Sequence, residues 1–110
     1  MQKSYGGKVV IDHENGERHS RYILRIISNC LDCEIGRISF RRIDEHYVIY
    51  DSDSGVLGIE HQREVAEKRA YGHAYTLASK IVEDKNEGLS LDDEPRYILE
   101  DRTRMRELLL

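Results

Sequence analysis

The sequence predicts an α+β fold in which a small antiparallel sheet of three or four strands carries two or three helices on one face. Three observations support this prediction. Residues 59–84 have the apolar periodicity of one long amphipathic helix. Residues 8–12, 34–42 and 46–50 are rich in strand-forming side chains. A length of 110 residues suits a single domain that spans residues 1–110.

The first predicted strand covers residues 8–12, which are mostly β-branched and follow Gly6 and Gly7. We expect residues 1–6 to form a flexible N-terminus. Asn15 and Gly16 come next, and this dipeptide is typical of tight hairpin turns.

Residues 17–31 carry two conflicting patterns. The turn dipeptide lies between apolar runs, which favours a hairpin and a second strand. The apolar residues in this segment nevertheless repeat at helical spacing, and strict alternation fails where apolar residues are adjacent. Those at helical spacing are Tyr22, Ile23, Ile26, Ile27, Cys30 and Leu31. Because the helical pattern is the longer one, we predict a helix here and keep the strand as the alternative.

Residues 34–42 and 46–50 are predicted to be two strands joined by a tight reversal at Asp44 and Glu45. The second of these is apolar or aromatic on both faces, so we expect both faces to be at least partly covered. Residues 51–55 then break the chain before the long helix.

The predicted helix at 59–84 has an alanine-rich arc that suits close packing against a flat apolar surface. The residues of this arc are Ile59, Ala66, Ala70, His73, Ala74, Leu77, Ala78 and Ile81. Gly88 ends the helical region.

Residues 89–110 are expected to be a C-terminal docking segment. The acidic residues 92–94 and Pro95 predict the start of a helix, with a strand over residues 96–100 as the alternative. The resulting order, β-α-β-β-α followed by a helix or a strand, is similar to the ferredoxin-like two-layer sandwich.

The composition bounds the partners only weakly. The formal net charge is −4, from 21 acidic and 17 basic residues, which argues against a general binder of phosphate backbones. No apolar run approaches the roughly 20 residues needed to cross a bilayer. We therefore expect a cytoplasmic protein without a membrane partner, with both cysteines reduced.

Two short motifs resemble metal sites. Cys30 and Cys33 have the spacing of a chelating or redox pair, but two further ligands for a closed zinc site are missing from the sequence. We expect Cys30 to pack in the core and Cys33 to begin a strand. Asp51 and Asp53 resemble the start of a calcium loop but miss its glycine and glutamate positions, which favours an Asx turn. No metal or other cofactor is expected.

The histidines do not suggest a catalytic site. His46 is expected to be a solvated turn residue, and His61 and His73 to lie about 18 Å apart along the long helix. The catalytic sequence motifs for hydrolases, nucleotide binding and zinc proteases are missing. A metal-dependent hydrolase around the two aspartates therefore stays an alternative only.

A basic and aromatic sheet face is a second alternative, because such a face can stack single-stranded bases. Its residues are Arg37, Arg41, Arg42 and Tyr47, with Tyr50 beside them.

The leading hypothesis is a non-catalytic protein-binding or regulatory module that forms a homodimer. The chain ends in three leucines, which favour burial against the core or against another chain. Tyrosine suits such an interface because one end of it is apolar and the other polar. The predicted interface residues are Tyr71, Tyr75, Met105, Leu108, Leu109 and Leu110.

Overall fold

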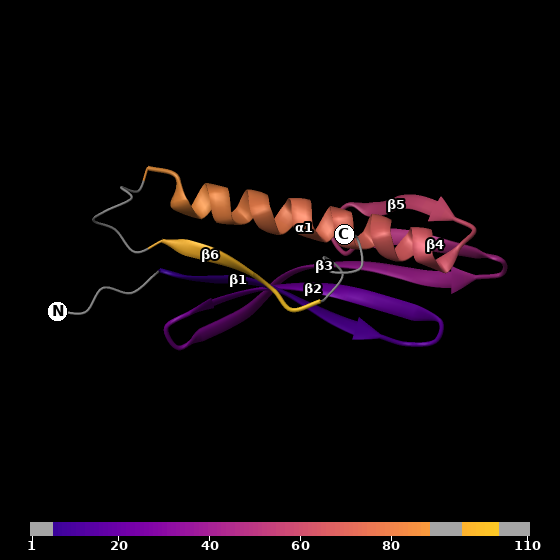
Figure 1. Ribbon diagram of the computed structural model, residues 1–110, viewed down its shortest axis with the longest axis horizontal. Helices are drawn as coiled ribbons and strands as arrows, with labels where there is room; N and C mark the ends of the chain where they lie inside the picture. Colours follow the sequence, from indigo (N-terminus) through magenta and orange to yellow (C-terminus); the bar gives the residue numbers. More distant parts are fainter. Residues whose placement is uncertain (1–5, 89–95, 104–110) are drawn as a thin grey trace.

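The computed structural model describes residues 6–88 and 96–103, which form a six-stranded mixed sheet with one helix along one face (Figure 1). The elements in chain order are β1 (Gly7–Asn15), β2 (His19–Ser28), β3 (Leu31–Ile43), β4 (His46–Asp51), β5 (Gly55–Glu60), α1 (Arg63–Asn86) and β6 (Tyr97–Asp101).

The first five strands form an antiparallel meander, and β6 then pairs in parallel with β1. The strand order across the sheet is β5-β4-β3-β2-β1-β6, so β5 and β6 are the two edge strands. The helix between them returns the chain across the sheet, which gives the parallel pairing of β6.

The predicted fold class is therefore wrong. The prediction was a ferredoxin-like sandwich with an antiparallel sheet of three or four strands and two or three helices, whereas the described residues form six strands in a mixed sheet and one helix. Three segments account for the difference: residues 17–31, 55–60 and 96–100.

The helix predicted for residues 17–31 is wrong because most of this segment is strand β2. Gly16 donates its amide to the His19 carbonyl at 2.8 Å, and the turn dipeptide closes the β1–β2 hairpin. Tyr22 and Leu24 are fully buried on the face that carries α1. Ile23 lies on the opposite face with Arg25. Because β2 is partly apolar on both faces, its adjacent apolar residues mimic helical spacing.

The long helix is confirmed as a single element, although it begins at Arg63 and ends at Asn86 instead of covering 59–84. Residues 55–60 form strand β5, so Ile59 belongs to the sheet and its side chain is 57% exposed. Gly88 has φ of +82°, which suits the glycine that follows a helix.

The alanines of the predicted arc pack against the sheet, whereas Ile59 lies in β5 and His73 is exposed. Four alanines at successive i, i+4 positions are fully buried: Ala66, Ala70, Ala74 and Ala78. The sheet supplies the large core side chains opposite them: Val9, Ile11, Tyr22, Leu24, Ile38, Phe40 and Ile49. Methyl side chains let the helix backbone approach the sheet closely, so the volume of the core comes from the strands.

Residues 97–101 form the alternative strand in place of the favoured helix. Asn86, the last residue of α1, anchors the start of β6 at Tyr97. Its Nδ2 donates to the Tyr97 carbonyl at 2.9 Å, and its Oδ1 accepts from the Tyr97 amide at 2.7 Å. Gly6 donates its amide to the Arg96 carbonyl at 2.9 Å. The rest of the predicted flexible N-terminus and the predicted helix start at 92–95 lie outside the described residues.

Substitutions on two sides of α1 test the packing of the alanine arc. We expect Ala74→Leu to lower the free energy of unfolding by about 1–3 kcal/mol, because added methylene groups do not fit between the helix and the sheet. Gly72→Ala is the matched control: a Cβ there meets no atom within 4 Å. Since a helical alanine is favoured over glycine, we expect it to raise stability by about 0.5–1 kcal/mol. Urea denaturation measures the free energy of unfolding of both variants. An Ala74→Leu variant as stable as the wild type would contradict the close packing of the alanine arc.

Candidate functional site

The sheet face turned away from α1, here called the outer face, is divided into two halves of different chemistry. Over β6, β1, β2 and the first part of β3 it carries alternating charges that pair across strands. The pairs are Lys8–Glu100 (3.1 Å), Arg25–Asp12 (3.0 Å), Arg102–Asp12 (3.6 Å), Arg21–Glu14 (3.5 Å), Arg37–Glu34 (2.9 Å) and Arg25–Asp32. Hydrogen bonds from Arg102 and Lys8 lower the pKa of Glu100. The charged side chains in these pairs are therefore neutralised by partners on the same half of the face.

The other half of the outer face is mostly apolar and exposed, with Arg41 of β3 as the charged residue beside Val48. It covers β4, β5 and the end of β3, and its cross-strand rows follow from the strand register. We call it the β5-edge patch and define it as Ile43, Val48, Tyr50, Val56 and Ile59. Ile43 is 50% exposed, Val56 65% and Ile59 57%. None of the ion pairs formed by the residues that the structure describes lies on this half.

Two histidines lie beside each other at one end of this patch. The pairing of Tyr47 with Glu60 places His46 opposite His61, and their ring centres are 4.7 Å apart with the rings tilted by 50°. Both side chains border a surface hollow of about 470 Å³. Its lining is Ile43, Asp44, His46, Val48, Ile59 and His61. The helix predicted for residues 59–84 included His61, so strand β5 was not recognised and this histidine pair was not predicted.

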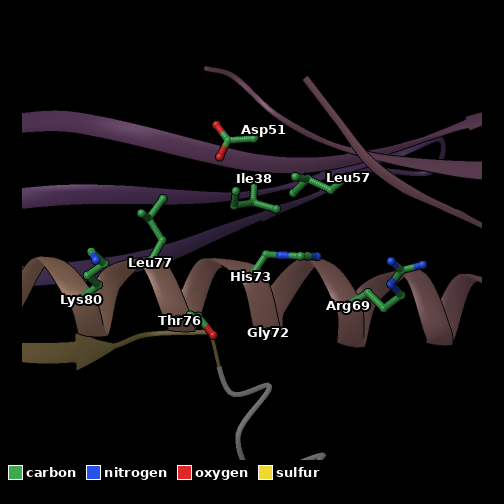
Figure 2. Close-up of a pocket in the computed structure, with 9 residues that line it drawn as sticks. All are labelled: Ile38, Asp51, Leu57, Arg69, Gly72, His73, Thr76, Leu77 and Lys80. Atoms are coloured by element: carbon green, nitrogen blue, oxygen red, sulfur yellow. The ribbon is translucent and has the colours of Figure 1, made fainter. Parts of the chain in front are cut away.

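A second hollow lies on the helix side of the same sheet edge. It is a groove of about 530 Å³ between α1 and strands β3 to β5. Figure 2 shows Leu77 and Lys80 of α1 on one side and Ile38, Leu57 and Asp51 on the other. The remaining lining residues are Arg69, Gly72, His73 and Thr76.

Arg69 closes one end of this groove. It binds Glu60 and lies over Gly58, where a Cβ would come within 2.6 Å of its Nη2 atom. The glycine therefore lets the guanidinium lie close to the strand.

The buried polar residues of the described fold hold the helix and the sheet together. Tyr71 donates its hydroxyl to Asp101 Oδ2 at 2.5 Å, and Asp101 Oδ1 accepts from the amide of Thr103 at 2.9 Å. Tyr22 lies between the His13 ring, stacked at 4.5 Å, and the Tyr71 ring at 6.1 Å. The Tyr22 hydroxyl is buried without a hydrogen-bond partner among the described residues, and burial raises the pKa of Tyr22.

The predicted interface is only partly accessible. Tyr71 is 4% exposed and belongs to the core, so it presents almost no surface to a partner. Tyr75 is half-buried and packs against the core. Met105, Leu108, Leu109 and Leu110 lie outside the described residues.

The predicted basic and aromatic residues do not share one face. Arg37 and Arg41 lie on the outer face with Tyr50, and Arg37 is paired with Glu34. Arg42 and Tyr47 lie on the face of Phe40, and the Tyr47 ring contacts the Phe40 ring edge-on at 6.0 Å. The structure therefore does not bring the four predicted residues together as one stacking surface.

The structure places the two motifs that resemble metal sites as follows. Cys30 and Cys33 are both exposed free thiols, so the expected core position of Cys30 is wrong, while Cys33 lies within β3. Asp53 donates its amide to Asp51 Oδ1 at 2.8 Å, which is the expected Asx turn. Over residues 6–88 and 96–103, no group of three or more His, Cys, Asp and Glu side chains is arranged to hold a metal ion.

Comparison of the chain with known protein families, with curated proteins and with solved structures finds no match. In the described part of the chain, no helix has the length and apolar character needed to span a membrane.

Two tyrosine variants test the buried polar contacts. We expect Tyr71→Phe to lower the free energy of unfolding by about 1.5–3 kcal/mol, because it removes a hydrogen bond to a charged partner. Tyr22→Phe removes a buried hydroxyl that has no partner among the described residues, so we expect stability to stay the same or rise. Thermal and urea denaturation compare the two. Equal losses in both variants would show that Tyr22 has a partner in solution.

Proposed function

We propose that this protein is a non-catalytic protein-binding module that self-associates through the β5-edge patch. The observation that carries the proposal is the exposure of Ile43, Val56 and Ile59 on a face whose other half is covered by paired charges. Contiguous exposed apolar surface is typical of interaction sites. The proposal moves the interface from the helix and C-terminus, where the sequence predicts it, to the outer face of the sheet.

A second copy of the chain suits this patch because its five residues are uncharged, and Arg41 of β3 lies beside Val48 at the border of the patch. A two-fold axis parallel to β4 and β5 places each cross-strand row of one copy against the same row of the second copy. The row of Val48 and Ile59 then packs against the same row of the second copy, and the row of Tyr50 and Val56 does likewise. Two sheets packed in this way lie about 10 Å apart with their side chains interdigitated.

The opposite edge of the sheet is less suitable. Ile98 on β6 is 42% exposed, but it lies among the charges of Lys8, Glu100 and Arg102. Charged side chains on an edge strand oppose association. The contrast between the two edges supports the β5 side as the interface.

The positions of the buried titratable groups support a non-catalytic role for the protein. Tyr71 and Asp101 bind each other between α1 and β6, and neither lines the groove or the histidine hollow. The groove instead has an apolar floor with Arg69 paired to Glu60 at one end, which suits contact with a partner.

Charge substitutions at the two sheet edges test the interface. We expect the wild-type chain to dimerise in the presence of EDTA and Ile59→Lys to be monomeric, because a desolvated ammonium group is costly at an apolar contact. Ile98→Lys is the matched control and should dimerise like the wild type. Sedimentation velocity measures all three.

At protein concentrations low enough to dissociate the dimer, both variants should unfold at the urea concentration of the wild type, since both side chains are exposed. A wild-type chain that stays monomeric at high micromolar concentration would contradict self-association. Loss of the dimer in Ile98→Lys alone would place the interface at β6.

A further inference from the structure

We propose that His46 and His61 form half of a zinc site that a second copy of the chain completes. This inference rests on the proposed self-association through the β5-edge patch. It assigns a ligand class, a divalent transition-metal ion, to the hollow at the end of that patch.

The geometry of the pair suits one shared ion. A zinc–nitrogen bond to imidazole is about 2.0–2.1 Å long, so two imidazoles on one tetrahedral ion hold their ring centres about 5 Å apart. The ring centres of His46 and His61 are 4.7 Å apart. The pairing of Tyr47 with Glu60 holds the two histidine backbones side by side, so rotation of the exposed side chains can bring both rings to one ion.

The surroundings leave both rings available as ligands. Neither ring has a hydrogen-bond or ion-pair partner among residues 6–88 and 96–103. The hollow around them is lined by the aliphatic side chains of Ile43, Val48 and Ile59, with Asp44 as the acidic residue. Imidazole nitrogens in an apolar setting are suitable ligands for zinc.

One chain supplies only part of the ligand set. Zinc in closed sites is held by four ligands, whereas the described residues of one chain bring two imidazoles together here. The two-fold axis proposed above maps the row of His46 and His61 onto the same row of the second copy. Four imidazoles then face one another across the gap between the two sheets, which a single tetrahedral ion can bridge.

The test uses the full chain carrying Cys30→Ser and Cys33→Ser, because two exposed thiols are zinc ligands in their own right. Cobalt(II) titration should give the visible absorption of a tetrahedral ion, with its end point at one ion for each two chains. At a zinc concentration about 100 times its dissociation constant, linkage tightens the dimer about 100-fold. Sedimentation velocity with zinc and with EDTA measures this change.

Two variants separate the site from the interface. His46→Gln and His61→Gln should each abolish the effect of zinc while the dimer formed in EDTA remains. His73→Gln, at an exposed histidine on the helix side, should leave the effect of zinc unchanged.

A dimer that persists in EDTA but does not respond to zinc would overturn this inference and leave the proposed function in place. Saturation at one ion per chain would also overturn it, because the site would not be shared. A chain that is monomeric both in EDTA and with zinc would overturn the proposed function itself.

Discussion

The close packing of the alanine arc of α1 against the sheet is the contact on which the rest of the described fold depends. The helix is 24 residues long, and it contacts every one of the six strands. Its fully buried residues are mostly alanines, so the strands must supply the bulk of the core through Tyr22, Phe40 and Ile11. A sheet of this width is needed because a long helix with small side chains buries little surface of its own.

This arrangement leaves the second face of the sheet without a helical cover in the described structure. The two halves of that face differ in the chemistry of their side chains. Paired charges such as Lys8–Glu100 and Arg25–Asp12 make one half compatible with water. Ile43, Val56 and Ile59 keep the other half apolar although their exposure means that they add little to the stability of one chain. The exposed position of these three side chains is better explained by contact with a partner than by a contribution to the stability of one chain.

Sequence patterns predicted an element correctly where only one of its faces is apolar. They failed where both faces of the element are apolar. The helix and its buried alanines could be predicted because Ala66, Ala70, Ala74 and Ala78 repeat at one clear period. Strand β2 could not, since Ile23 on the outer face interrupts the alternation of Tyr22 and Leu24. Strand β5 was hidden because Ile59 also fits the helical arc. The pairing of His46 with His61 depends on β5, so the candidate site could not be found without it.

The two histidines limit how the β5-edge patch can be covered. Both border the hollow that Ile43 and Ile59 line, so a partner that buries these aliphatic side chains also removes the imidazoles from water. Burying polar groups without new partners costs free energy, and the described part of the chain offers them none. An ion shared between two copies satisfies the ring nitrogens of both copies together. In the proposed dimer, the apolar surroundings that favour association would therefore also make association sensitive to the metal.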